Sequence, residues 1–165
     1  MKLKIITQER VVFDQDVDAV YSKGIDGEFG LLKGHLPMMT ALDIGVTRAY
    51  IGDEIKKFTT MGGILQFKDE ECLILTTLAE PGEEIDEARA RMALEKAKLN
   101  LKNAQARMDA KRAEAAIARA EARLKARLSG ESNLKMWGVN VYPLIEWLAK
   151  SGVRFCYLPI SPCYN

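Results

Sequence analysis

Histidine and cysteine are scarce among the 165 residues of this chain, and their scarcity excludes several kinds of chemistry. The only histidine, His35, rules out a metal site built on a histidine pair, and no nucleophile motif stands beside it in "KGHLP". Cys156 and Cys163 lack the C-x-x-C spacing of zinc ligands. With Cys72 as the third cysteine, no disulfide framework is expected, which favours a reducing compartment.

Long apolar runs and glycine-rich phosphate loops are also missing. No run of about 18 apolar residues could span a membrane, and the N-terminus lacks the apolar core of a secretory signal. Neither G-x-x-x-x-G-K-[ST] nor G-x-G-x-x-G occurs. With 48% hydrophobic and 28% charged residues, the sequence predicts an ordinary globular protein with no catalytic residue and no metal site.

Charge divides the chain into parts, although the net charge is only +1. Residues 1–85 carry 15 acidic and 9 basic side chains, whereas residues 86–128 carry 6 acidic and 12 basic side chains. Together with composition, this predicts three regions: a β domain at 1–84, a helical domain at 85–128 and a tail at 129–165.

The first region has the pattern of short strands separated by turns. "KLKIIT" and "VDAVYSK" alternate with the two-residue period of a half-buried strand. Gly52-Asp53 stands between two further alternating runs and predicts a hairpin turn with glycine at its first central position. Turn signals recur about every 8–12 residues, which is typical of a β-sandwich or barrel, and Pro81-Gly82 closes the region.

The second region is rich in Ala, Lys, Arg, Glu and Leu, which all favour helix. The predicted break lies between Asn103 and Asp109, with Asp109 as the N-cap of a second helix. One apolar stripe comprises Ala90, Leu94, Ala97, Leu101, Ala104 and Met108, and the other comprises Ala113, Ile117, Ala120 and Leu124. The stripes favour an antiparallel helix pair. One long helix is the alternative, because no proline or glycine interrupts the stretch.

Arg89 falls in the first turn of the first predicted helix, where the helix dipole disfavours a cation. Asp86 is the expected N-cap, and Ile85 would pack on Ala90 across the start of the helix. In an antiparallel pair, the end of the second helix would lie beside this start.

Two arginines of the second helix could join Arg89. Arg119 and Arg123 are four residues apart and therefore share a helix face. In a folded pair the three guanidiniums would converge near Asp86 as an anion site, and phosphate is the usual anion. A solvated basic face is the alternative. A nucleic-acid surface is not expected, because the helices lack aromatic side chains that stack on bases.

The tail, residues 129–165, differs in composition from the rest and holds both tryptophans. Trp137, Tyr142 and Trp147 suit an interface with a partner. The alternative is an extension with no role of its own.

Three motifs resemble one protein family. "DGEFGLLKGHLPMMTAL" (26–42) is similar to the G-E-[LF]-G-[IL]-x-x-G-H-x-P-[LM]-x-[TA]-x-L stretch of the ε subunit of rotary F-type ATP synthases. "MGGIL" (61–65) resembles its S-G-G-[FI]-[LV] hairpin, and "IDEARA" resembles the I-D-x-x-R-A motif of the bacterial members that bind ATP. The likeness covers about residues 1–128, and the tail departs from it.

The resemblance implies a ten-stranded β-sandwich, followed by an antiparallel two-helix hairpin, in a non-catalytic subunit of the central stalk. Glu28 matches a loop that approaches the c-ring, and His35 matches a histidine near the γ subunit. The family's subunit joins rotor parts and restrains ATP hydrolysis when its helices extend along γ toward the catalytic β subunits. Through that complex it would lie at the cytoplasmic face of a bacterial plasma membrane.

In ATP-binding members of the family, the nucleotide holds the helices folded. The residues here that match their ATP site are Glu80, Ile85, Asp86, Arg89, Ala90, Arg119 and Arg123. Lys96 departs from the pattern, because several members place an arginine there, and lysine lacks the bidentate fork. The resemblance thus implies no required cofactor, with ATP as a regulatory ligand. A free-standing adaptor that binds protein partners through the same two domains is the alternative function.

Overall fold

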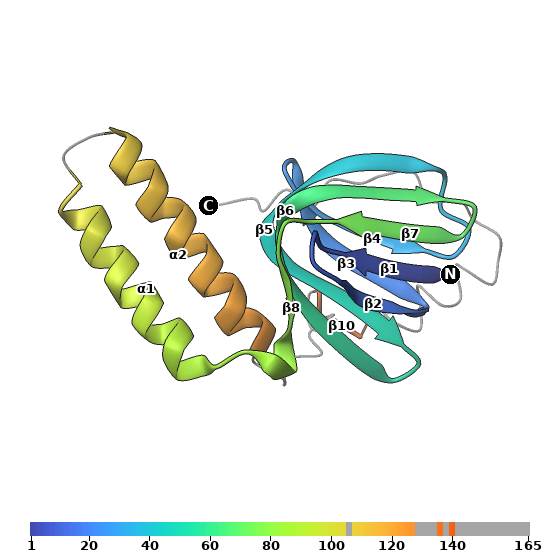
Figure 1. Cartoon of the computed structure of the whole chain (residues 1–165). Helices are drawn as coiled ribbons and strands as arrows, with labels where there is room; N and C mark the ends of the chain where they lie inside the picture. Colours follow the sequence, from blue (N-terminus) through green and yellow to red (C-terminus); the bar gives the residue numbers. More distant parts are fainter. Residues whose placement is uncertain (105–106, 128–134, 137–138, 141–165) are drawn as a thin grey trace.

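Eight strands form the N-terminal part of the molecule, and two helices follow them (Figure 1). The computed structural model describes residues 1–104, 107–127, 135–136 and 139–140. The strands of the sandwich are β1 (Lys2–Ile6), β2 (Val11–Asp16), β3 (Ala19–Gly24), β4 (Gly27–Leu32), β5 (Met38–Ile51), β6 (Glu54–Lys68), β7 (Glu71–Leu75) and β8 (Ala79–Pro81). The helical elements are the short 3₁₀ turn η1 (Gly82–Glu84), α1 (Glu87–Lys102) and α2 (Arg107–Arg127).

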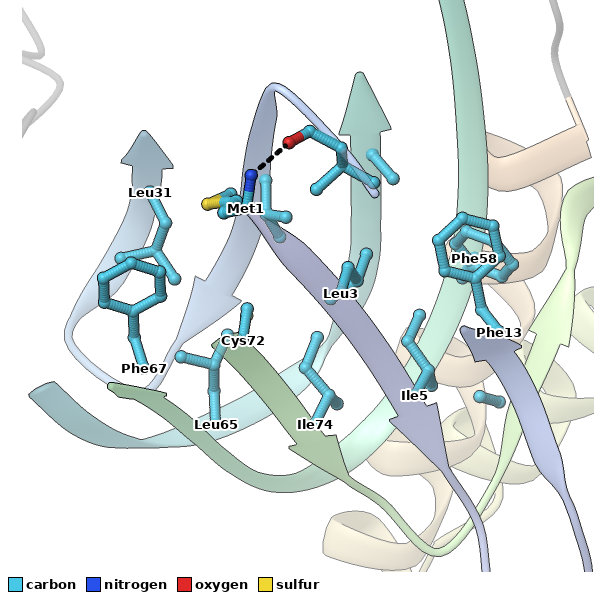
Figure 2. Close-up of a cluster of buried hydrophobic side chains, with 14 of the residues drawn as sticks. Met1, Leu3, Ile5, Phe13, Leu31, Phe58, Leu65, Phe67, Cys72 and Ile74 are labelled. Atoms are coloured by element: carbon cyan, nitrogen blue, oxygen red, sulfur yellow. Dashed lines mark hydrogen bonds between the residues drawn. The ribbon is translucent and has the colours of Figure 1, made fainter. Parts of the chain in front are cut away.

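The strands follow the order β2-β1-β7-β6-β5-β3-β4, and β8 also pairs with β6. β1 and β7 run parallel, and the other pairs are antiparallel. One edge of β6 pairs with β8 in the first half of the strand and with β7 near its end, and its other edge pairs with β5. Alternate residues of the strands point inward, and Figure 2 shows Leu3, Ile5, Leu65, Phe67 and Ile74 meeting in the core, each at most 1% exposed.

The predicted sandwich is confirmed, but the expected ten strands are wrong for the described residues. β5 has 14 residues and β6 has 15, and their pairing continues through an irregular step at Asp43 and Gly62. Gly62 and Gly63 adopt φ values of +75° and +124°, which a glycine tolerates without a break in the strand. Because both long strands bend without ending, the sandwich has eight strands. β9 (Lys135–Met136) and β10 (Val139–Asn140) form a separate two-stranded ladder.

The Gly52-Asp53 hairpin turn is confirmed. Ile51 pairs with Glu54 across it, and Gly52 adopts φ +56°. Asp18 braces the turn, because its Oδ2 accepts a hydrogen bond from the Gly52 N–H at 2.8 Å and its Oδ1 accepts one from Lys33 Nζ at 2.8 Å. The Lys33 ammonium and then the Gly52 N–H lower the pKa of the Asp18 carboxyl.

The two helices are separated as predicted, but one cap is wrong. Asp86 caps α1, since its Oδ1 accepts a hydrogen bond from the Arg89 N–H at 3.1 Å. α1 ends at Lys102 and α2 begins at Arg107, so the chain does not form one long helix here. Asp109 is therefore not the N-cap of α2. It lies inside the first turn, where the helix dipole also favours a carboxylate.

α2 packs against β5 and β6, and α1 lies on the outer side of α2, running in the opposite direction (Figure 1). The buried helix residues are all alanines: Ala90, Ala97, Ala113, Ala120, Ala122 and Ala126. Small side chains let the helices approach closely but bury little apolar area. Within the described residues no helix is long and apolar enough to cross a membrane. The predicted interface residues Trp137, Tyr142 and Trp147 lie outside the described residues.

We expect Asp18→Asn to lower the free energy of unfolding at pH 7 by about 0.5–1 kcal/mol, because it removes charge-assisted hydrogen bonds from a half-exposed turn. A carboxylate whose pKa is depressed in the folded state stabilises above its unfolded pKa of about 3.9, and this stabilisation is lost as pH falls through the folded pKa. The difference in free energy of unfolding between the variant and the wild type should therefore shrink below about pH 4.

Denaturant unfolding at a series of pH values measures this difference in free energy. Asp53→Asn, in the same exposed turn, is the control; an equal loss in both variants would contradict the prediction.

Candidate functional site

The last turns of α2 meet the β8–η1 segment, which joins the sandwich to α1. Arg123 forms a bidentate ion pair with Glu80, with Nε 2.7 Å from Oε2 and Nη2 3.0 Å from Oε1. Both side chains are about 30% exposed, at 29% and 32%. One turn further along α2, Arg127 Nη1 donates to the Glu83 carbonyl oxygen at 2.9 Å. The end of α2 is thus held to the segment by directed polar contacts.

The sandwich fixes the position of Glu80. Glu80 pairs with Thr59 across the β6–β8 ladder, and its N–H donates to the Thr59 hydroxyl at 3.1 Å. Thr59 is fully buried, so the backbone on which the carboxylate stands has little freedom. In return, the Glu80 carboxylate raises the pKa of Arg123. The Glu80 carboxylate is therefore held in place by β8, and both of its oxygens bind the guanidinium of Arg123 on α2.

The start of α1 lies at the same end of the helix pair as the end of α2 (Figure 1). Ile85 and Ala90, the residues expected to pack across this start, are both buried. Arg89 is exposed, and within the described residues its guanidinium makes no hydrogen bond or ion pair. In that part of the chain, its side chain therefore presents an unpaired cation at the positive end of α1.

The predicted ATP-site residues are thus placed as follows. Glu80 and Arg123 are in direct contact, and Ile85, Asp86, Arg89 and Ala90 form the start of α1. Arg119 lies one turn before Arg123 on α2 and, in the described part of the chain, has no ion-pair partner. That the three arginines converge on one anion stays a prediction.

Sequence reasoning missed three contacts at this junction. It included Glu80 and Arg123 in one site but did not foresee that they pair with each other. It also missed Arg127, and Arg10 of the turn between β1 and β2, whose Nη2 lies 3.3 Å from Glu84 Oε2. No local pattern marks these contacts, because their partners are 43 to 74 residues apart in the chain.

A hollow of about 550 Å³ lies beside the junction, between β2, the start of β6 and the end of α2. Its apolar wall comprises Val12, Phe13, Ile55, Phe58 and Pro81. The hollow is also lined by three basic residues, Lys56, Lys57 and Arg127, and by three acidic ones, Asp53, Glu83 and Glu84. The balanced charge does not favour an anionic ligand there.

Glu28 and His35, the predicted c-ring and γ contacts, lie elsewhere on the sandwich. Glu28 follows the turn between β3 and β4, and its Oε2 accepts from Arg48 Nη2 at 2.9 Å. His35 follows β4, where its Nδ1 lies 2.8 Å from the Leu36 carbonyl oxygen and its ring meets Phe67 edge-on. Both are accessible at least in part, and neither has a geometry that indicates catalysis.

An apolar surface lies on the outward side of the sandwich. We call Ile25, Met39, Ile64 and Leu75 the outer apolar surface; their exposed fractions are 66%, 66%, 49% and 48%. Ile64 pairs with Leu75 on one side and with Ala41 on the other, and the Ile25 N–H donates to the Ala41 carbonyl oxygen. Met39 lies two residues before Ala41 on the same face. Contiguous exposed apolar residues of this kind mark protein interaction sites.

Comparison with known families matches the chain in two consecutive parts. The family model described as ATP synthase, Delta/Epsilon chain, beta-sandwich domain matches residues 1–82. The model of the long alpha-helix domain of the same family matches residues 83–127. Residues 128–165 lie outside both matches.

Individual relatives agree with this result. The ATP synthase epsilon chain of Carboxydothermus hydrogenoformans is 43% identical over 101 residues, which are 61% of this chain and 75% of that protein. The epsilon chain of Dehalococcoides mccartyi (strain BAV1) is 42% identical over 101 residues, 61% of this chain and 72% of that protein.

Among solved structures, a chain of the Euglena gracilis mitochondrial ATP synthase (OSCP/F1/c-ring) is 28% identical with a TM-score of 0.67, and the match covers 76% of this chain and 79% of that one. A chain of the Tetrahymena thermophila mitochondrial ATP synthase central stalk and c-ring has a TM-score of 0.53 over 76% of this chain and 95% of that one. At 15% identity, that second match shows the fold alone.

We expect Glu80 and Arg123 to be energetically coupled by about 1 kcal/mol, more than an exposed ion pair, because their bidentate contact is about two-thirds buried. A double-mutant cycle with Glu80→Gln, Arg123→Gln and the double variant, followed by helical circular dichroism in denaturant, measures this coupling. The exposed Glu95–Lys98 pair on α1 provides the control cycle, with an expected coupling of about 0.3 kcal/mol. Equal coupling in the two cycles would refute the prediction.

Proposed function

The chain belongs to the ATP synthase delta/epsilon chain family, and we propose that it acts as the non-catalytic epsilon subunit of an F-type ATP synthase. The support is the matched order of both family domains over the sandwich and the helices, together with relatives that carry the name ATP synthase epsilon chain. In this function the sandwich joins parts of the central stalk. The helices regulate the complex.

The sandwich binds the γ subunit and the c-ring. The outer apolar surface offers γ an exposed face of four large side chains, which stays uncovered while the helices are folded. The turn that carries Ile25 also leads to Glu28, so an acidic side chain adjoins the apolar face. The Euglena neighbour comes from a structure of F1 with its c-ring, which supports partners of this kind. The protein is then associated with the membrane only through the complex, at its cytoplasmic face.

ATP holds the two helices folded on the sandwich. The observation that carries this proposal is Arg89, an exposed guanidinium without a partner in the described residues, at the N-terminal end of α1. Arg119 and Arg123 lie on α2, so a triphosphate that contacts both helices binds the folded form better than the extended one. A tenfold difference in affinity between the two forms corresponds to about 1.4 kcal/mol.

The extended helices restrain ATP hydrolysis. Residues 86–128 carry twice as many basic as acidic side chains, so an extended helical region presents net positive charge to the acidic segments of the β subunits. Docking of α2 through alanines and a few polar contacts keeps the folded form only weakly favoured, as a switch needs.

Calorimetric titration of the full chain with ATP should show binding, and Arg89→Ala should weaken it at least about tenfold, because a charge-assisted phosphate contact is removed. Arg91→Ala is the matched control, since Arg91 is an exposed arginine of the same helix turn that is already paired with Glu87. No heat with millimolar ATP, or the same affinity in both variants, would end the ATP proposal and leave the family assignment intact.

Ile64→Glu should weaken binding to a purified γ subunit at least about tenfold, because it places a charge in the middle of the outer apolar surface. Size-exclusion chromatography and a surface-binding assay measure the complex. Leu99→Glu, which changes a similarly exposed leucine on α1, should bind γ like the wild type. Full γ binding by Ile64→Glu would show that another face makes the contact.

A further inference from the structure

The approach of α2 to the β8–η1 segment leaves no space for a side chain at position 82. A β-carbon placed on Gly82 would lie 2.5 Å from the Ala126 carbonyl oxygen, 3.1 Å from the Ala126 carbonyl carbon and 3.3 Å from the Lys57 carbonyl oxygen. All three are backbone atoms, so no side-chain rotation relieves the overlap. The two shorter distances are to Ala126 of α2. The longest distance, to Lys57 of the sandwich, is the least severe overlap.

The glycine is not required by its own backbone. Gly82 has no φ in the left-handed region, unlike Gly52, Gly62 and Gly63. Another residue could adopt its conformation without strain. The requirement for glycine therefore comes from the helix that packs on it.

We propose that Gly82 is the notch that lets the helix pair close on the sandwich. The contacts that hold α2 lie on both sides of it in the sequence: Glu80 binds Arg123, and the Glu83 carbonyl oxygen accepts from Arg127. The Ala126 carbonyl oxygen, in the last described turn of α2, sits directly over the glycine.

Closure is then decided at the end of α2. A side chain at position 82 pushes the helix end away, and the Glu80–Arg123 and Glu83–Arg127 contacts separate together. Because α1 lies on the outer side of α2, it moves with it. This inference rests on the proposed function only in giving the open form a role in regulation.

Hydrogen–deuterium exchange of the full-length chain, without nucleotide or partner, tests the notch. In Gly82→Ala, backbone amides of α2 should exchange at least about 10-fold faster, while those of β1 and β7 keep their wild-type rates. Glu83→Ala is the matched control, because it places alanine next to the notch and keeps the carbonyl that binds Arg127. Its α2 amides should exchange as in the wild type.

Unchanged exchange of α2 in Gly82→Ala would overturn the proposal. Faster exchange throughout the sandwich would also overturn it, because Gly82 would then serve the β fold. As a second measurement, the coupling between Glu80 and Arg123 should vanish in a Gly82→Ala background, and its persistence would again count against the notch.

The exchange experiment tests the role of Gly82 independently of the proposed function. Exchange is measured on the isolated chain, so a failure to bind ATP leaves the notch intact. In a reconstituted enzyme, Gly82→Ala should lower the hydrolysis rate at saturating ATP at least about twofold, because more chains would be open. An unchanged rate, together with fast exchange of α2, would refute the inhibitory role and not the notch.

Discussion

The contact between Glu80 and Arg123 is the interaction on which the arrangement of the two domains depends. It joins a strand whose backbone is fixed by the buried Thr59 to a helix whose buried residues are all alanines. The Arg127–Glu83 hydrogen bond adds a second polar contact one turn further along. Burial of an alanine methyl contributes about 0.8 kcal/mol at most, so the apolar contacts of α2 are individually weak. A bidentate, partly buried ion pair is comparable to one of them in strength and far more demanding in geometry. The polar contact therefore defines where α2 docks, and the alanines allow it to approach.

The same ion pair affects how a phosphate could bind. The guanidinium of Arg123 already has a carboxylate partner, whereas Arg89 and Arg119 have none in the described residues. An incoming triphosphate would therefore gain most from Arg89 and Arg119, and it would compete with Glu80 for Arg123. Because a carboxylate and a phosphate repel each other, their shared use of Arg123 limits affinity. Limited affinity of this kind suits a regulatory ligand, which must be able to dissociate.

Local features of the fold could be predicted from the sequence, because their causes are local. Asp86 caps α1 by accepting a hydrogen bond from the Arg89 N–H, only three residues away in the chain. Gly52 lies in the turn between β5 and β6, which are consecutive strands. Asp109 was predicted as a cap but lies in the first turn of α2, since a carboxylate is favoured at both places. The count of ten strands came from the resemblance alone, and it was wrong because β5 and β6 continue past the irregular step at Asp43 and Gly62. The Glu80–Arg123 pair and the Gly82 notch join distant segments, and no pattern of neighbours encodes them. Glu28 and His35 were selected by resemblance alone.

The outer apolar surface and the docking site of α2 lie on different parts of the sandwich, which fits the proposed function, in which one subunit both binds a stalk partner and regulates. Ile64 and Leu75 are about half exposed with the helices folded in place, so α2 does not cover the outer apolar surface. The helices dock instead on β5, β6 and the β8–η1 segment. Opening of the helix pair would break contacts at Glu80, Gly82 and Glu83 and leave Ile64 and Leu75 unchanged. In the proposed function, a stalk partner therefore stays bound to the sandwich through both states, and only the helices move.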